Sequence, residues 1–367
     1  MHNHTCGCGH HEGDAGCGSH EHDHGEVCAC GAHHVSPEVE PLASAWSMLG
    51  KTSKEQTVPP TREFDFDWEG QKIHVYQWGK ADNIPVVLLH GFMQTGLSWS
   101  IIASALSGNH CAYALDFLGH GRSSKPSNVE LYRYDAMVRM VESFLEQVAC
   151  VGHEGAKRRA HVMGYSMGGR IALGLASSEK DLLYSLILES CNFGPEGNEQ
   201  RAAAEERNVG WAQRLRNNGI EEFVEYWETL PLFESQREMG LDEELRPERL
   251  ANDAESMALC LEGAGKHAMP DASQAFAVVA STWVPVKYLW GYDDCGSEAV
   301  AHQLEHDGID VTSFGTGHNV HLEAPVLYGT VVQEFLSGIE PRGCSPRRFR
   351  ASTIRKDIHE RFSLGKS

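Results

Sequence analysis

Short apolar runs alternate with helical stretches through residues 61–340, and few folds accommodate such a pattern. The strand-like runs lie at 72–78, 85–90, 111–117, 160–165, 184–190 and 284–291, and a helical pattern covers 131–149. Continuous apolar strands are those that a sheet buries on both faces, and strands separated by helices pair in parallel. The chain is therefore predicted to fold as an α/β protein with a mostly parallel sheet flanked by helices.

A helical insertion divides this predicted core. Residues 195–282 show helical patterning without a clear strand, before the last strands of the series. An all-helical segment at this point is most simply a cap over the carboxyl edge of the sheet, where α/β folds place their sites. The core is therefore predicted in two parts, 61–194 and 283–340. Outside it lie a His/Cys-rich leader and linker (1–60) and a basic tail (341–367).

Composition and charge narrow the classes of function. The formal net charge of −20 argues against general binding of nucleic acid. No apolar run reaches the roughly 20 residues that a membrane span needs, and the start lacks the basic and apolar segments of a signal peptide. We therefore expect a cytoplasmic protein without a membrane span, with its 11 cysteines reduced. The sequence indicates no particular oligomeric state.

One serine stands at the turn between a predicted strand and a predicted helix. The segment Gly164-Tyr165-Ser166-Met167-Gly168 fits the G-x-S-x-G pattern, in which glycines relieve crowding and the serine hydroxyl projects above the sheet. The pattern alone is weak, since glycine and serine are common, but the strand–turn–helix context is the confirmation that it requires. Ser166 is therefore the candidate nucleophile or base, with an ordinary βα turn as the alternative.

A serine at its ordinary pKa is a poor nucleophile or base, and it needs a histidine that a carboxylate holds in place. In folds with this turn the partners follow in the order Ser, Asp, His. Asp294, in "LWGYDD", and His318, in "FGTGHNVHLEAP", each follow a strand and are the candidate acid and base. Asp293 is the nearest rival acid. His321 is the rival base, but a helix is expected to begin there, which favours packing or capping.

The loop after the strand at 85–90 begins "HGFMQTGLSW" and is the expected source of one backbone N–H of an oxyanion hole. The residue after the candidate serine supplies the other, so the two amides belong to Phe92 and Met167. The side chains of both residues are expected only to pack. Two further histidines, His90 and His120, are interpreted as loop-structuring residues rather than as bases.

With these residues identified, residues 61–340 resemble the α/β-hydrolase superfamily. Within it they are most similar to the 2-succinyl-6-hydroxy-2,4-cyclohexadiene-1-carboxylate synthase family of menaquinone biosynthesis. The motif "GYSMGGR" places Arg170 one helical turn after the serine. The cap segments "NEQRAAAEERNVGWAQRL", "GIEEFVEYWETLPLF" and "RLANDAESMALCLEGAG" follow that family's order and spacing, and "GTGHNVHLEAP" resembles its histidine loop.

The resemblance implies a lyase that uses no cofactor for catalysis. Its substrate would be a small polycarboxylate, 2-succinyl-5-enolpyruvyl-6-hydroxy-3-cyclohexene-1-carboxylate, from which pyruvate leaves by 2,5-elimination. Ser166, activated by its histidine and aspartate, would act as a base rather than form an acyl-enzyme. The substrate-binding residues that the resemblance implies are Tyr165, Arg170, Arg201, Trp227 and Arg249. Arginine also suits such a substrate on physical grounds, since its planar guanidinium can form two parallel hydrogen bonds to a carboxylate.

Some positions depart from that family's pattern. Where the family often has paired arginines three and four positions after Arg201, this chain has Ala204 and Glu205, and the acid often seen seven positions on is Asn208 here. The segment "CNFGPEG" replaces a more usual proline-glycine turn. These departures affect the detailed carboxylate contacts and leave the triad intact. A solvated helix face is the alternative role for each arginine, as cap packing is for Trp227.

The leader carries a dense set of metal ligands. They are His2, His4, Cys6, Cys8, His10, His11, Cys17, His20, His22, His24, Cys28, Cys30, His33 and His34. Imidazole and thiolate suit zinc or nickel, but the spacing does not match a folded zinc finger, so the ligand density predicts loose, multi-site binding. A disordered leader that binds metal only adventitiously is the alternative.

Deletion of the leader is expected to remove most binding of zinc or nickel and to leave catalysis unchanged. The reason is that the ligands are concentrated in the first 34 residues, away from the candidate triad. Equilibrium dialysis against micromolar metal would compare the full chain with a chain that begins at residue 61. Equal metal binding by the two chains would contradict the assignment.

Two alternatives to the lyase remain open from the sequence. One is a carboxylester or thioester hydrolase with the same triad and a differently charged pocket. The other is a metal-sequestering protein whose α/β body serves as a scaffold for the leader. The ordered triad disfavours this second alternative as the function of the whole protein. The arginines and the cap segments favour the lyase over the hydrolase.

Overall fold

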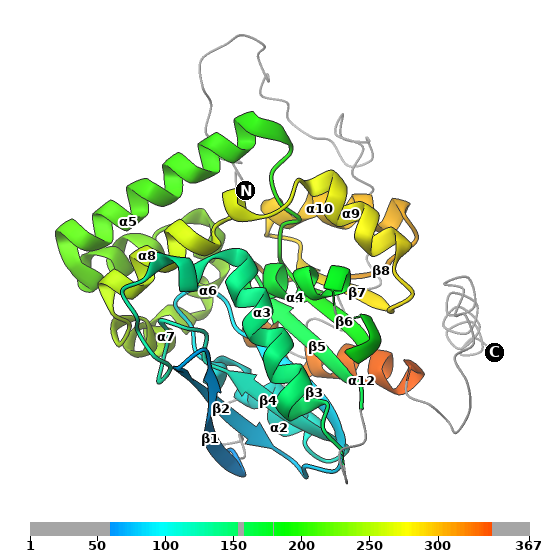
Figure 1. The fold of residues 1–367 in the computed structure, drawn as a ribbon. Helices are drawn as coiled ribbons and strands as arrows, with labels where there is room; N and C mark the ends of the chain where they lie inside the picture. Colours follow the sequence, from blue (N-terminus) through cyan, green and yellow to red (C-terminus); the bar gives the residue numbers. More distant parts are fainter. Residues whose placement is uncertain (1–58, 153–157, 179, 340–367) are drawn as a thin grey trace. The chain divides into compact units, whose positions relative to one another are not determined.

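The computed structural model describes residues 59–152, 158–178 and 180–339 (Figure 1). The metal ligands predicted in the leader and the basic tail at 341–367 lie outside the described residues. Within those ranges, no helix combines the length and the apolar content that crossing a bilayer requires.

The strands of the described chain form one sheet. They are β1 (Arg62–Trp68), β2 (Gln71–Trp78), β3 (Ile84–Leu89), β4 (His110–Leu115), β5 (Ala160–Tyr165), β6 (Leu183–Glu189), β7 (Val286–Gly291) and β8 (Asp310–Phe314). Their order across the sheet is β1-β2-β4-β3-β5-β6-β7-β8. β2 is antiparallel to its neighbours β1 and β4, and the remaining neighbours are parallel. The carboxyl ends of the parallel strands therefore meet at one edge of the sheet.

Helices cover both faces of this sheet. They are α2 (Ser100–Leu106), α3 (Tyr134–Phe144), α4 (Met167–Ser178), α9 (Ala272–Ser281), α10 (Cys295–His306), the short α11 (Val320–Glu323) and α12 (Pro325–Ile339). Successive residues of a strand point to opposite faces. Val87 and Leu89 of β3 join the buried cluster that includes α3, α4, α9 and α10, whereas Val86 and Leu88 join the cluster that includes α2 and α12. The central strands β3 to β7 are mostly apolar because both of their faces are buried.

The described helices between β6 and α9 form a cap. They are α5 (Gly197–Glu228), α6 (Glu234–Met239), α7 (Leu241–Leu250) and α8 (Ala254–Ala264), and Figure 1 shows them gathered on one side of the sheet. They enclose a buried cluster of their own, which includes Leu215, Phe223 and Met257. Gly219 interrupts α5 with a φ of +86°, a conformation that favours glycine, so α5 consists of two helical segments.

The predicted α/β class is confirmed, and most strand positions agree with the apolar runs. β5 occupies residues 160–165 as predicted, and the helix expected at 131–149 consists of α3 followed by the π-helical turn Leu145–Ala149. β1 was absent from the prediction. Its sequence, REFDFDW, alternates charged with aromatic residues because this edge strand is largely exposed. The apolar signal thus identified the buried strands and missed the exposed one.

Candidate active site

A strained turn presents Ser166 between β5 and α4. Its φ is +50°, which L-residues rarely adopt, and its amide donates a 2.9 Å hydrogen bond to the carbonyl of Glu189. The motif glycines leave room for this turn. A Cβ on Gly164 would lie 2.4 Å from the Gly168 carbonyl oxygen, and a Cβ on Gly168 would lie 2.2 Å from that of Leu89. Both positions therefore require glycine.

Ser166, His318 and Asp294 form a continuous hydrogen-bonded chain. Ser166 Oγ lies 3.0 Å from His318 Nε2, and His318 Nδ1 lies 2.7 Å from Asp294 Oδ2. Asp294 follows β7 and His318 follows β8, and these two strands are neighbours in the sheet. The fold thus brings together three side chains that are up to 152 positions apart in the sequence.

The carboxylate of Asp294 is buried and held on several sides. It accepts hydrogen bonds from the Ser297 hydroxyl at 2.6 Å and from the Gly296 amide at 3.2 Å. Burial raises the pKa of Asp294, but the charge of His318 and these hydrogen bonds outweigh it, so that pKa lies below its ordinary value. The carboxylate therefore stays ionised at neutral pH. The rival Asp293 is exposed, and the geometry favours its buried neighbour.

The rival base, His321, has a structural environment. It is the second residue of α11 and is fully buried. Its Nδ1 lies 2.9 Å from both carboxylate oxygens of Glu189, and its ring stacks on that of Trp99 with centroids 4.0 Å apart. His321 therefore braces the loop of His318 against the end of β6, in agreement with the expectation that it packs.

His90 and His120 are buried neutral groups. His90 Nε2 accepts a 2.9 Å hydrogen bond from the Phe117 amide, which leaves Nδ1 to donate to the Gly91 carbonyl at 2.7 Å. Burial holds the pKa of His90 well below its ordinary value, and burial lowers the pKa of His120 to about 4. These contacts agree with the interpretation of both histidines as loop-structuring residues.

Two backbone amides lie where an oxyanion hole is expected. Met167 is the first residue of α4, so its N–H belongs to the turn that lacks an intrahelical acceptor. Phe92 lies in the loop after β3, where the amide of Gly91 donates to the side chain of Gln94 at 3.2 Å. Among the backbone hydrogen bonds of the described residues, neither the Phe92 nor the Met167 amide is a donor. Both amides are therefore available to negative charge that develops nearby.

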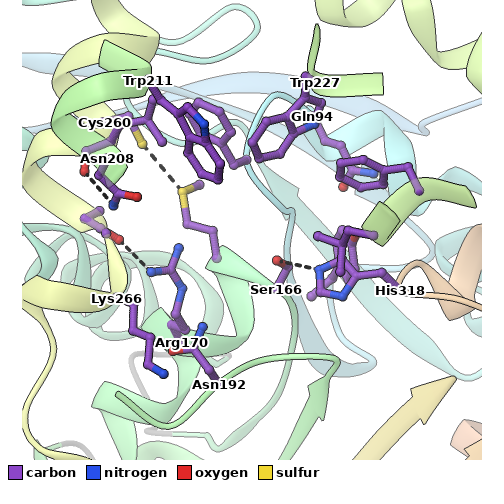
Figure 2. Close-up of a pocket in the computed structure, with 18 of the residues that line it drawn as sticks. Gln94, Ser166, Arg170, Asn192, Asn208, Trp211, Trp227, Cys260, Lys266 and His318 are labelled. Carbon is purple, nitrogen blue, oxygen red and sulfur yellow. Dashed lines mark hydrogen bonds between the residues drawn. The ribbon is translucent and has the colours of Figure 1, made fainter. Parts of the chain in front are cut away.

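A pocket lies between the carboxyl edge of the sheet and the cap (Figure 2). Loops after β3, β5, β6 and β8 and residues of α5, α7 and α8 line it. The lining residues include Phe92, Tyr165, Ser166, Met167, Arg170, Asn192, Arg207, Asn208, Trp211, Trp227, Arg249, Lys266 and His318. The lining combines apolar and aromatic side chains with a few polar and charged groups, as small-molecule sites do.

Aromatic side chains form one wall of this pocket. The ring of Trp227 packs against that of Phe92, with centroids 5.3 Å apart, and against that of Trp211 at 5.4 Å. Tyr165 lies next to the candidate serine, and its ring centroid is 5.2 Å from that of His318. Tyr165 and Trp227 therefore both line the pocket, as the resemblance implies.

Arg170 lies on α4, one helical turn after Ser166, and its guanidinium lines the pocket (Figure 2). It donates a 3.0 Å hydrogen bond to the carbonyl of Ala264 at the end of α8. Burial lowers the pKa of Arg170, and no carboxylate among the described residues forms an ion pair with it. A buried guanidinium without a carboxylate partner is suited to an anionic ligand.

The other two predicted arginines are paired within the protein. Arg249 lines the pocket, but its guanidinium lies 3.0 Å from the carboxylate of the buried Glu228. Arg201 is absent from the pocket lining. Its guanidinium binds Asp271 at 2.6 Å and donates to the Met269 carbonyl at 2.8 Å, which fastens α5 to the segment after α8.

Two pocket cations were absent from the prediction. Arg207 lies on α5, with its guanidinium 5.0 Å from the ring centroid of Trp211, and Lys266 follows the end of α8. In the sequence Arg207 follows two glutamates, so it looks like part of a solvent-exposed helix face. Lys266 belongs to no recognised motif. The spacing of four residues between Arg207 and Trp211 was the available signal, since residues four apart meet on a helix.

Known proteins resemble this chain over most of its described length. The pattern of the Alpha/beta hydrolase family matches residues 86–328. A Bacillus subtilis (strain 168) protein, provisionally named as a 2-succinyl-6-hydroxy-2,4-cyclohexadiene-1-carboxylate synthase, is 30% identical over 277 residues, which are 74% of this chain and 97% of that protein. A synthase of the same name from Yersinia enterocolitica serotype O:8 / biotype 1B is 29% identical over 254 residues, which are 69% of this chain and 86% of that protein.

Solved structures extend this similarity. The structure of MenH from S. aureus has a TM-score of 0.66 and 26% identity, and the match covers 73% of this chain and 99% of that chain. The enol-lactonase from Burkholderia xenovorans LB400 shares the fold, with a TM-score of 0.62, 20% identity and coverage of 75% and 100%. This chain is therefore an enzyme of the Alpha/beta hydrolase family, most similar among the relatives compared above to 2-succinyl-6-hydroxy-2,4-cyclohexadiene-1-carboxylate synthases.

Proposed function

We propose that this enzyme eliminates pyruvate from 2-succinyl-5-enolpyruvyl-6-hydroxy-3-cyclohexene-1-carboxylate and forms 2-succinyl-6-hydroxy-2,4-cyclohexadiene-1-carboxylate, a step of menaquinone biosynthesis. The observation that carries the proposal is one pocket lined both by Ser166 and His318, whose hydrogen-bonded chain ends on Asp294, and by Arg170, a cation without a carboxylate partner among the described residues. The names of the sequence relatives support this reaction over others of the same fold.

In this proposal Ser166 acts as a base. Its Oγ removes a proton from the ring while His318 Nε2, 3.0 Å away, takes the hydroxyl proton. Asp294 stabilises the imidazolium that forms. The electron pair left on the ring moves through the ring double bond toward the carbon that bears the enolpyruvyl oxygen, and the C–O bond breaks. The departing enolate of pyruvate takes the proton that the imidazolium of His318 gives up, so pyruvate leaves and the enzyme returns to its starting protonation state. No acyl-enzyme forms, so no water is needed to regenerate the serine.

The rest of the pocket has complementary roles in this mechanism. The amides of Phe92 and Met167 stabilise the enolate-like charge that develops as the proton departs. Tyr165 and Trp227 flank the ring, and Arg170 holds a carboxylate. The protein groups supply the base, the acid and the charge stabilisation, so the proposed step uses no cofactor.

The test compares two reactions of the purified enzyme. Release of pyruvate from the enolpyruvyl substrate would be followed with lactate dehydrogenase and NADH, and hydrolysis of p-nitrophenyl acetate would be followed by absorbance. We expect fast release of pyruvate and slow ester hydrolysis. Rapid ester hydrolysis without release of pyruvate would instead assign the protein as a serine hydrolase of the same fold.

Arg170→Ala is expected to lower kcat/KM for pyruvate elimination by about 10- to 100-fold, the usual value of a charge-assisted hydrogen bond. Hydrolysis of neutral p-nitrophenyl acetate should fall far less, since that ester offers no carboxylate to the guanidinium. Arg139→Ala, on the outer face of α3 and paired with Asp135 at 2.8 Å, is the matched control. Equal losses in both reactions would assign Arg170 a structural role.

A further inference from the structure

Three cations line one pocket without a carboxylate partner among the described residues: Arg170, Arg207 and Lys266. Figure 2 shows Arg170 and Lys266 together, across the pocket from His318. Burial lowers the pKa of Lys266, Glu196 opposes this in part, and the like charges of Arg207 and Arg170 lower that pKa further. Like charges gathered in one pocket are favourable only where an anion balances them.

The turn that carries Lys266 is held firmly. A Cβ on Gly265 would lie 1.9 Å from the side-chain nitrogen of Asn208, so the turn packs directly on α5. Arg201, also on α5, binds Asp271 at the far end of the same segment. The ammonium of Lys266 itself makes one weak contact, 3.4 Å from Gln200 Oε1. A fixed backbone thus presents an ammonium group whose hydrogen-bonding capacity is largely unused.

Arg207 differs from the other arginines of α5 that the structure describes. Arg201 binds Asp271, Arg214 binds Glu222, and Arg216 binds two further glutamates. Arg207 instead stands over Trp211, and burial lowers its pKa. Three of these four arginines form ion pairs, and the fourth, Arg207, has no ion-pair partner within the described part of the chain and lines the pocket.

We propose that Lys266 and Arg207 form a second carboxylate site, carried by the cap and separate from Arg170 on the core helix α4. This inference rests on the proposed function and deepens it. The proposed substrate bears carboxylates on its ring, its succinyl arm and its enolpyruvyl arm. One guanidinium cannot bind all of them. Arg170, four residues from Ser166, serves the carboxylate near the reacting carbon. Lys266 and Arg207 serve one that lies farther from it.

A carboxylate far from the reacting carbon keeps its charge through the reaction. Interactions with it are therefore equally strong in the ground state and in the transition state, and their loss raises KM without changing kcat. Lys266→Gln and Arg207→Gln are each expected to raise KM for pyruvate elimination by about tenfold, with kcat within about twofold of wild type. Lys266→Arg should restore most of the affinity, because it restores the charge.

The matched control is Arg214→Gln, which removes the same charge from the same helix but from a residue paired with Glu222 outside the pocket. It is expected to leave KM unchanged. If pyruvate is released normally and the KM values of Lys266→Gln and Arg207→Gln equal that of Arg214→Gln, the second carboxylate site is wrong while the proposed function stands.

A binding measurement separates the two proposals where no pyruvate is released. Quenching of tryptophan fluorescence would follow binding of phthalate, a ring dicarboxylate, with neutral phthalamide and inorganic phosphate as controls at equal ionic strength. Weaker binding of phthalate by Lys266→Gln would support the site even if the lyase reaction is absent. Unchanged binding by that variant, no binding by wild type, or tighter binding of phosphate than of phthalate would overturn it.

Discussion

Replacement of Ser166 by alanine is expected to lower kcat for pyruvate elimination by roughly 10³-fold or more. The hydroxyl is the only group on this side chain that can relay a proton to His318, 3.0 Å away. Alanine has the same Cβ as serine, so the φ of +50° imposes a similar backbone cost in both proteins. The fold should therefore persist, and a melting curve beside the kinetic assay would check it. Turnover near the wild-type rate would remove Ser166 from the mechanism.

Ser190→Ala is the matched control for this experiment. Ser190 is also buried, also has a positive φ of 46°, and follows β6, the strand next to β5. It is absent from the pocket lining. We expect its replacement to leave kcat within about twofold of wild type, as for a residue without contact to the reacting groups. The comparison of the two variants separates the loss of the Ser166 hydroxyl from any general effect of replacing a serine at the end of a strand.

Replacement of Asp294 by asparagine is expected to lower kcat by about 10³- to 10⁴-fold with little change in KM. The carboxylate accepts the Nδ1 proton of His318 at 2.7 Å, which leaves Nε2 free to receive a proton from Ser166. An amide can instead donate to Nδ1, which would place the ring proton on Nε2 and abolish the base. Kinetic assay of the purified variant at neutral pH is the measurement.

Asp293→Asn, one position away and exposed, is the control for this loss of charge. It should retain activity close to wild type. Stability gives a second readout, because the pKa of Asp294 is lower in the fold than its ordinary value. The ionised carboxylate therefore stabilises the native state at neutral pH, and this contribution is lost as the pH falls through the lowered pKa. The stability gap between wild type and Asp294→Asn should narrow in acid.

The core of the fold was predictable because burial leaves a direct trace in the sequence. β3 to β7 are apolar on both faces, so each strand appears in the sequence as a continuous apolar run. β1 leaves no such trace, since four of its seven residues are exposed and charged residues alternate along it. The local pattern of apolar residues thus reports how deeply a strand is buried, and the edge strand β1 is largely exposed.

The candidate triad was predictable for a different reason. Its members follow strands whose carboxyl ends a parallel sheet brings to one edge, so the order Ser, Asp, His narrowed the acid to Asp294 or Asp293 and the base to His318 or His321. The choice within each pair also rested on the position in the loop and on the family resemblance.

The charge of the pocket was not predictable in this way. Arg201 lies on the same helix as Arg207, and only the tertiary contacts show that Asp271 neutralises the first while the second lacks such a partner among the described residues. Whether an arginine has an ion-pair partner depends on residues far away in the sequence, and the helical periodicity of the sequence does not identify them.

The division of the core by the cap has a consequence for how the enzyme is made. Ser166 and the strands up to β6 are synthesised first, the cap follows, and β7 and β8, which carry Asp294 and His318, emerge last and dock at the open edge of the sheet. A nascent chain that has reached only the cap therefore exposes a serine with no imidazole to activate it. The hydrogen-bonded chain of Ser166, His318 and Asp294 can therefore form only after β7, β8 and the loops that follow them have been synthesised.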